Sequence, residues 1–273
     1  MTTNGVDLET LPACIICGGE LSTVMKVPDA LCEQVVLQEC KGCGITLQNP
    51  RLSHAAMLAI ENESTVYNLP PEEVEFRISG PLDGLVLHLD RLVQSHGKRW
   101  LDIGCNRGIL LEAARRRGWQ VRGVEIADEA AQRARADYGL TIYSDLAALE
   151  HEPPFDVITA WHVLEHTYDP VAFLRAAEAR LAPGGVLALQ VPAYEHLEDY
   201  RARDQFGGIV CAVHNFYFTE ATLRQVVART GLQPLEFSVD HDLLFLTAVC
   251  NKPVEAAPMP GVWQRLRARL RLG

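Results

Sequence analysis

Three features are absent from this sequence of 273 residues, and each absence narrows its function. No run of eighteen apolar residues occurs, so we expect no membrane span. The first residues, MTTNGVDLETLPAC, lack a basic stretch followed by an apolar core, so we predict no secretory signal and a cytoplasmic location. An excess of basic residues is also absent, because the formal net charge is −10. This charge argues against nucleic acid as a partner, since nucleic-acid binding depends on a basic surface.

The composition is that of an ordinary globular protein, with 48% hydrophobic and 22% charged residues. The length is sufficient for one large core and one small additional domain. The one basic cluster is C-terminal, in VWQRLRARLRLG, and it follows the proline- and alanine-rich PVEAAPMPG. We interpret residues 253–273 as a solvated tail on a tether rather than as a site for an anionic partner.

Four of the eight cysteines form two C-x-x-C-G pairs, Cys14 with Cys17 and Cys40 with Cys43. In each pair two thiolates can reach one metal ion from a tight turn, and four sulfurs make a closed tetrahedral site for Zn²⁺. A closed site supports folding rather than catalysis, so residues 1–50 are predicted to form a structural zinc ribbon. Two alternatives fit less well, because disulfides are rare in a reducing cytosol and a redox C-x-x-C needs only one pair.

Residues 51–96 are predicted to be a helical linker. The segment NPRLSHAAMLAI favours a helix that begins at Ser53. Apolar residues then recur at helical spacing from Val74 to Leu92, with an interruption at Gly80-Pro81. We therefore expect a kinked helix or a pair of helices before the first strand of the main domain.

The most informative segment is RWLDIGCNRG, from Arg99 to Gly108, an apolar strand followed by a glycine-containing turn that opens a helix. Such a turn presents backbone N–H groups and a positive helix end at the carboxyl edge of a parallel sheet, where a nucleotide-like cofactor can bind. Asp102, Gly104 and Gly108 have the spacing of an acidic-x-Gly-x-Gly-x-Gly signature. Asn106 replaces the middle glycine, and asparagine tolerates positive φ. The pattern differs from the dinucleotide fingerprint G-x-G-x-x-G, although similar turns also arise through packing alone.

This turn resembles the first motif of class I S-adenosylmethionine (SAM) dependent methyltransferases. Four later segments resemble further motifs of that family in the same order: WQVRGVEIAD, LTIYSDL, FDVITAWHVLEHTYDP and LAPGGVLALQVP. The resemblance implies an α/β, Rossmann-like fold for residues 97–252, with a seven-stranded, mostly parallel sheet, helices on both faces and a final antiparallel pair of strands. It also implies that residues 51–96 cover the cofactor cleft as a lid, where Tyr67 is either a lid contact or a packing residue.

SAM is therefore the expected cofactor. Glu125, at the tip of the second strand, can accept hydrogen bonds from both ribose hydroxyls, because an ionised carboxylate is only an acceptor. In the resembled family, an acid at the position of Asp145 receives the exocyclic amine of adenine, and the N–H of the next residue, here Leu146, meets a ring nitrogen. The predicted cofactor-binding residues are Asp102, Gly104, Cys105, Asn106, Gly108, Glu125, Ile126, Asp145, Leu146 and His162.

Methyl transfer from a sulfonium requires the protein to position the acceptor and, for a hydroxyl or carbon acid, to remove a proton. Histidine titrates near neutral pH and suits this task, so His162, His166 and His214 are the catalytic candidates. His162, at the end of the fourth strand, is expected to line the cleft, whereas His166 is equally well explained as a structural residue. The spacing of these two residues also fits a metal site, which we do not favour because a clear third ligand is lacking. The remaining histidines have no supporting context: His54, His88, His96, His151, His196 and His241.

A long aromatic and charged segment, residues 194–218, interrupts the alternation of strands and helices. Insertions at this edge of such a fold commonly carry substrate specificity. The candidate acceptor contacts in this segment are Tyr194, Arg203, His214, Asn215 and Tyr217.

The expected function is SAM-dependent transfer of a methyl group to a small-molecule acceptor, by O- or C-methylation. A zinc ribbon joined to such a domain resembles enzymes that methylate sugars, glycan precursors or secondary metabolites, and IGCNRG-x-LL is similar to the turn of sugar-nucleotide C-methyltransferases. One alternative is a ribosomal-RNA methyltransferase, since some of these enzymes carry an N-terminal zinc module, but the acidic charge argues against it. Another is a non-catalytic SAM-binding interaction protein, which the acids and histidines at the cleft disfavour. The acceptor atom and the oligomeric state stay open.

Overall fold

A seven-stranded sheet forms the centre of the larger part of the molecule. Its strands are, in spatial order, β13 (Gln233–Asp240), β14 (Phe245–Asn251), β11 (Leu181–Pro192), β10 (Phe155–Trp161), β7 (Arg99–Ile103), β8 (Gln120–Val124) and β9 (Ile142–Tyr143). The five strands from β11 to β9 are parallel, and β14 and β13 are antiparallel to their neighbours. The predicted Rossmann-like sheet with a final antiparallel pair is therefore confirmed.

Helices cover both faces of this sheet, as expected. One face carries α2 (Pro71–Ser79), α3 (Pro81–Leu92), α4 (Ile109–Arg116) and α5 (Asp128–Tyr138), and the other carries α6 (Pro170–Arg180) and α9 (Glu220–Val227). Alternate residues of β10 serve the two faces, because side chains of a strand point to opposite sides: Val157 packs with the first set and Ile158 with the second. Gly80-Pro81 separates α2 from α3, which confirms the predicted break.

The N-terminal residues form two small antiparallel sheets. One contains β1 (Thr2–Thr3), β2 (Val6–Glu9) and β6 (Arg51–Leu52). The other contains, in order, β12 (Phe216–Tyr217), β5 (Thr46–Gln48), β4 (Glu33–Cys40) and β3 (Leu21–Asp29). Strand β12 is far from the others in sequence, yet Phe216 lies opposite Leu47 and Tyr217 lies opposite Thr46. The segment 194–218 thus contributes a strand to the N-terminal sheet.

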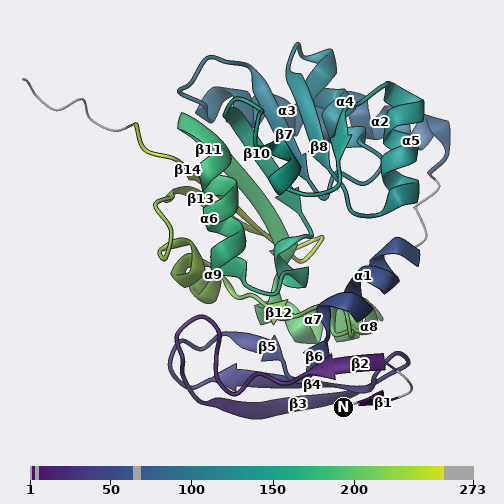
Figure 1. Cartoon of the computed structure of the whole chain (residues 1–273), viewed down its shortest axis with the longest axis vertical. Coiled ribbons are helices and arrows are strands. Elements are labelled where there is room, and N and C mark those ends of the chain that lie inside the picture. Colours follow the sequence, from purple (N-terminus) through teal and green to yellow (C-terminus); the bar gives the residue numbers. More distant parts are fainter. Residues whose placement is uncertain (1, 4–5, 64–68, 255–273) are drawn as a thin grey trace, which may run out of the picture.

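The structure is a computed structural model, and it describes residues 2–3, 6–63 and 69–254. Tyr67 and residues 255–273 of the predicted tail lie outside the described residues. In the part that is described, no helix combines the length and the apolar character that a bilayer crossing requires. Three helices, α1 (His54–Glu63), α7 (Leu197–Ala202) and α8 (Phe206–Ile209), lie between the N-terminal sheets and the seven-stranded sheet (Figure 1).

The two parts of the molecule share one core. Cys14, Cys40 and Leu47 of the N-terminal part are buried in the same cluster as Leu174 of α6 and Val226 of α9. The cluster continues beneath these helices to the inner face of the seven-stranded sheet. Burial of apolar surface therefore couples the stability of the cysteine pairs to that of the main sheet.

Asn215 links the segment before β12 to the loop after β10 through hydrogen bonds. Its buried side chain donates from Nδ2 to the carbonyl oxygens of His166 at 2.9 Å and Thr167 at 3.3 Å. Its backbone N–H donates to the carbonyl of Glu165 at 2.8 Å, and its own carbonyl accepts from the N–H of Gln48 at 2.9 Å. One residue thus connects the main sheet with the N-terminal sheet.

We predict that Asn215→Ala lowers the free energy of unfolding by about 1–3 kcal/mol, because it removes a donor from two carbonyls near the buried Asn215 side chain. Urea denaturation of the full chain measures this change. Gln132→Ala, at an exposed position of α5, is the control and should change the value by less than about 0.5 kcal/mol. Identical denaturation midpoints for Asn215→Ala and the wild type would show that this link does not stabilise the fold.

Candidate functional site

A cavity of about 790 Å³ lies at the carboxyl ends of β7, β8, β9 and β10. From β7 the chain adds β8 and β9 on one side of the sheet, and from β10 it adds β11 on the other side. The boundary between β7 and β10 is therefore the topological switch point, where open α/β sheets bind ligands. The structure brings eight of the predicted site residues together in the cavity lining: Gly104, Asn106, Glu125, Ile126, Asp145, Leu146, His162 and His166.

The turn after β7 has left-handed backbone conformations at alternate residues. The φ angles are 70° at Gly104, 47° at Asn106 and 75° at Gly108. A Cβ atom on Gly104 would lie 2.5 Å from Cγ2 of Val163, so glycine is required there by both conformation and space. Asn106 adopts the positive φ that its position in the motif demands.

Glu125 is held in place by backbone donors on both of its oxygens. Its Oε2 accepts from the N–H of Asn106 at 2.7 Å, and its Oε1 accepts from the N–H of Ala127 at 2.9 Å. Each carboxylate oxygen can accept more than one hydrogen bond, so these backbone donors orient the carboxylate without excluding a ligand hydroxyl. Asp145, at the end of β9, is oriented in a similar way, since its Oδ1 accepts from the N–H of Ala148 at 2.8 Å.

The described residues that line the cavity do not include Asp102, Cys105, Gly108 or His214. Asp102 is 4% exposed, and its Oδ1 accepts from Oγ1 of Thr159 at 2.6 Å. The thiol of Cys105 points into the core, where a Cβ atom on Gly123 would lie 2.6 Å from its Sγ. Asp102 and Cys105 therefore support the turn from its buried side.

His162 lies at the cavity with its ring orientation fixed. Its Nδ1 is 3.2 Å from Oε1 of Glu165, and its ring meets that of Phe245 edge to face at 4.5 Å. Burial alone would raise the pKa of Glu165, but the hydrogen bond to His162 and two further histidine rings hold that pKa below its usual range. An ionised carboxylate only accepts, so Nδ1 of His162 carries the hydrogen and Nε2 carries the lone pair of the neutral ring.

The other two catalytic candidates form an edge-to-face pair with ring centroids 4.8 Å apart. His166 lines the cavity, and its Nδ1 is 3.1 Å from the carbonyl oxygen of Val213. His214 is 8% exposed, and its Nδ1 is 2.7 Å from the carbonyl oxygen of Ile209. Burial, with the ring of His166 nearby, lowers the pKa of His214 to about 4, so this ring is neutral at pH 7.

Residues of α1 and of the loop after β10 also line the cavity, and the sequence pattern did not single them out: His54, Met57, Leu58, Tyr168 and Phe173. The ring of His54 meets that of Tyr168 edge to face at 5.3 Å. No local signal identifies them, because their place depends on the fold of segments more than 100 residues apart. Among the described residues of the lining, Tyr194, Arg203, Asn215 and Tyr217 do not appear, and these residues pack the segment 194–218 instead.

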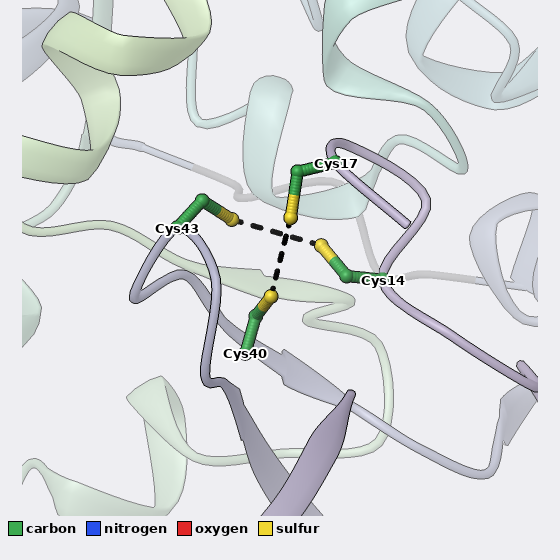
Figure 2. Close-up of side chains that lie close together, drawn as sticks. All are labelled: Cys14, Cys17, Cys40 and Cys43. Atoms are coloured by element: carbon green, nitrogen blue, oxygen red, sulfur yellow. Dashed lines mark hydrogen bonds between the residues drawn. The ribbon is translucent and has the colours of Figure 1, made fainter. Parts of the chain in front are cut away.

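The four paired cysteines form a second cluster, away from the cavity. The two turns bring Cys14, Cys17, Cys40 and Cys43 face to face, with all four sulfurs within 4.8 Å of one another (Figure 2). Sγ of Cys17 is 3.3 Å from Sγ of Cys40, and Sγ of Cys14 is 3.7 Å from Sγ of Cys43. Zinc–sulfur bonds of about 2.3 Å in a tetrahedron separate the sulfurs by about 3.8 Å, so the residues present fit a zinc ion.

A family model described as a methyltransferase domain matches residues 83–236, which is more than half of the chain. The chain belongs to this methyltransferase family. Among curated proteins, the ubiquinone biosynthesis O-methyltransferase of Xanthomonas campestris pv. campestris (strain B100) is 41% identical over 102 residues, covering 34% of this chain and 42% of that protein. The chain therefore spans less than half the length of the curated relatives that it matches.

Solved structures share the fold of this chain at low sequence identity. The plantazolicin methyltransferase BpumL, in complex with a pentazolic desmethyl analogue and SAH, has a TM-score of 0.55 and 14% identity and covers 67% of this chain and 87% of its own. A putative methyltransferase in a complex with the Haloferax volcanii Trm112 activator has a TM-score of 0.53 and 17% identity, over 68% of this chain and 95% of the other.

The buried carboxyl group of Asp102 generates a prediction about the pH dependence of stability. Burial raises the pKa of Asp102 to about 7, from an ordinary value of 3.8. As the pH rises from about 4 to about 7, the unfolded chain loses this proton while the folded chain keeps it, so Asp102 makes the fold less stable over that interval. The Asp102→Asn variant has no group that titrates at this position. Its stability relative to the wild type should rise by up to about 4 kcal/mol between these pH values and then level off.

Denaturant titrations at a series of pH values, without ligand, measure this difference. Asp83→Asn is the control of opposite sign: the hydrogen bond from Arg117 lowers the pKa of Asp83, so this variant should lose relative stability as the pH rises through about 4. A difference between Asp102→Asn and the wild type that does not vary with pH would contradict the assignment of a raised pKa to Asp102.

Proposed function

We propose that this protein is a SAM-dependent methyltransferase that acts on a small-molecule acceptor. The observation that carries the proposal is the meeting of the carboxyl ends of four neighbouring parallel strands at one cavity of about 790 Å³. Ligand cavities commonly measure about 300–1,000 Å³, so this volume suits a cofactor together with a small acceptor. The name of the curated relatives favours oxygen as the acceptor atom.

The cofactor half of this proposal assigns roles to the strand ends. Glu125 would accept the ribose hydroxyls, since it lines the cavity, backbone N–H groups orient both of its oxygens, and a carboxylate oxygen can accept more than one hydrogen bond. Asp145 and the N–H of Leu146 would contact the adenine. The backbone of the turn at Gly104 and Asn106 would pack against the cofactor. Bound SAM would supply an electrophilic methyl group and leave as the thioether.

The acceptor half rests on His162 and on the apolar lining. Nε2 of His162 would take the proton of the acceptor hydroxyl, and Glu165 would hold the ring in the tautomer that allows it. Apolar and aromatic side chains make up much of the remaining wall: Met57, Leu58, Trp161, Tyr168 and Phe173. We therefore propose an acceptor with an apolar or aromatic body that carries a hydroxyl group.

Turnover assays with separate acceptor pools test the proposal. The full chain is incubated with SAM and either hydroxylated aromatic compounds, sugar nucleotides or total RNA, and the formation of S-adenosylhomocysteine is measured. We expect product with a small-molecule pool only. Product with RNA alone would contradict the acceptor class, and tight SAM binding without product in any pool would favour a non-catalytic binding protein.

Two substitutions separate cofactor binding from methyl transfer. We predict that Glu125→Gln weakens S-adenosylhomocysteine binding about 10- to 100-fold, because charged hydrogen bonds contribute about 1.5–3 kcal/mol. His162→Gln should keep that affinity and slow methyl transfer about 10²- to 10⁴-fold, as expected for loss of a general base. Calorimetry measures the affinity, and single-turnover kinetics with saturating SAM measure the transfer.

Glu129→Gln is the matched control for Glu125→Gln, since Glu129 lies on α5 in an exposed ion pair with Arg133. It should leave both quantities at the wild-type level. Normal affinity in Glu125→Gln would remove Glu125 from the cofactor site. A fall in affinity without a fall in rate for His162→Gln would assign that residue to binding rather than to proton transfer.

We also propose that the cluster of Cys14, Cys17, Cys40 and Cys43 binds one structural Zn²⁺. All eight cysteines are unpaired thiols, which suits a reducing compartment and supports the proposed cytoplasmic location. Gly42 donates its N–H to Sγ of Cys40 at 3.3 Å, a contact that favours the thiolate a metal requires.

We predict that Cys43→Ser lowers the zinc content by one ion per chain, because three thiolates and a hydroxyl do not complete the tetrahedron. The melting temperature should fall as well, since Cys14 and Cys40 share a core with α6 and α9. Elemental analysis and thermal unfolding measure the two effects. Cys32→Ala, at a buried cysteine outside the cluster, should keep the wild-type zinc content, and an equal zinc content in Cys43→Ser would refute the site.

A further inference from the structure

Three side chains next to the cavity bring together atoms that can bind a metal ion, and among them His166 lines the cavity itself. Glu165, His166 and His214 each present one such atom, and these three atoms lie within 4.8 Å of one another. Glu165 and His166 lie in the short turn after β10, whereas His214 lies just before β12. The group therefore joins the main sheet to the segment that completes the N-terminal sheet.

Hydrogen bonds fix which nitrogen of each ring can bind a cation. Nδ1 of His166 contacts the carbonyl oxygen of Val213, and Nδ1 of His214 contacts that of Ile209. A carbonyl oxygen only accepts, so both Nδ1 atoms carry hydrogen, and Nε2 carries the lone pair in each neutral ring. Histidines that bind metals in proteins usually donate their other N–H to a carbonyl or carboxylate in this way.

The carboxylate supplies a second and independent observation. Glu165 is 1% exposed, and its Oε1 is engaged by Nδ1 of His162. Its Oε2 is buried and has no hydrogen-bond partner among the described residues. A buried carboxylate oxygen without a donor is costly, and Nε2 of each ring offers a cation a lone pair when the ring is unprotonated. A cation is the ligand that such a set of acceptors favours.

We propose that Glu165, His166 and His214 bind a divalent transition-metal cation such as Zn²⁺ or Fe²⁺. Two imidazoles with one carboxylate suit these ions, whereas Mg²⁺ and Ca²⁺ prefer ligand sets made of oxygen. Three protein ligands leave a coordination position open, unlike the closed set of four cysteines. Because His166 lines the cavity, the open position is accessible from the cavity.

The open position gives the metal a role at the acceptor. An acceptor hydroxyl bound there would lose its proton more readily, since the cation would stabilise the oxygen anion that attacks the methyl group. His162, joined to the other oxygen of Glu165, is placed to take that proton. This role rests on the proposed function, but the metal site itself does not.

Metal content measured by elemental analysis tests the site without recourse to activity. The full chain and its variants are loaded with Zn²⁺ and passed through a desalting column. We expect two ions per chain for the wild type and one for His214→Asn and Glu165→Gln, each of which should retain the ion held by four cysteines. Glu165→Gln preserves the side-chain shape, so it keeps the test decisive where His214→Asn fails to fold.

Two further variants serve as controls for this measurement. His162→Gln changes the residue on the other oxygen of Glu165 and should keep two ions. His241→Asn changes one member of another edge-to-face histidine pair, with His196 at 5.1 Å, and should also keep two. Loading with Co²⁺ distinguishes the two sites, because only the cysteine site gives thiolate-to-metal charge-transfer absorption. Cys17→Ser should weaken this absorption without affecting the second ion.

One ion per chain in the wild type would overturn the metal site, and so would two ions retained in both His214→Asn and Glu165→Gln. Calorimetry with SAM on the same samples keeps this result apart from the proposed function. A wild type that holds two ions but does not bind SAM overturns the proposed function alone. A wild type that binds SAM with one ion overturns the metal site alone.

Discussion

The short stretch from Val213 to Tyr217 is the constraint on which the arrangement of the cavity depends. Its backbone pairs with β5 on one side, and on the other it receives Nδ1 of His166 and donates to the carbonyl of Glu165. The side chain of Asn215 adds two hydrogen bonds to the same loop. This stretch therefore holds the loop after β10, which carries His162, Glu165 and His166, against the N-terminal sheet.

This connection gives the four cysteines an influence beyond their own turns. Ile45 and Leu47 follow the second cysteine pair, and both are buried in the core that α6 and α9 also share. A metal ion that orders the cysteine turns therefore orders β5 and, through β5, the strand β12 that positions His214. Order at the cysteine cluster is thus linked to the geometry of the cavity wall through a shared core and the pairing of β5 with β12.

Local pattern was sufficient to predict the strand ends but not the walls around them. Glu125, Asp145 and His162 follow apolar strands, and the carboxyl ends of parallel strands meet at one edge, so their convergence follows from rules of α/β topology. The lining by His54 and Met57 follows from no such rule, because it depends on how α1 is placed by contacts with segments distant in sequence. The same reason explains why β12 was not predicted: a strand of two residues has no periodicity to detect.

Glu165 illustrates how one buried group can serve two neighbours. Its Oε1 fixes the tautomer of His162, and its Oε2 faces the histidine pair of the proposed metal site. Burial of a carboxylate is costly unless hydrogen bonds or a cation compensate it. Oε1 has the hydrogen bond from His162, and the proposed cation would compensate Oε2. These two contacts explain how a carboxylate can persist in a buried turn after β10.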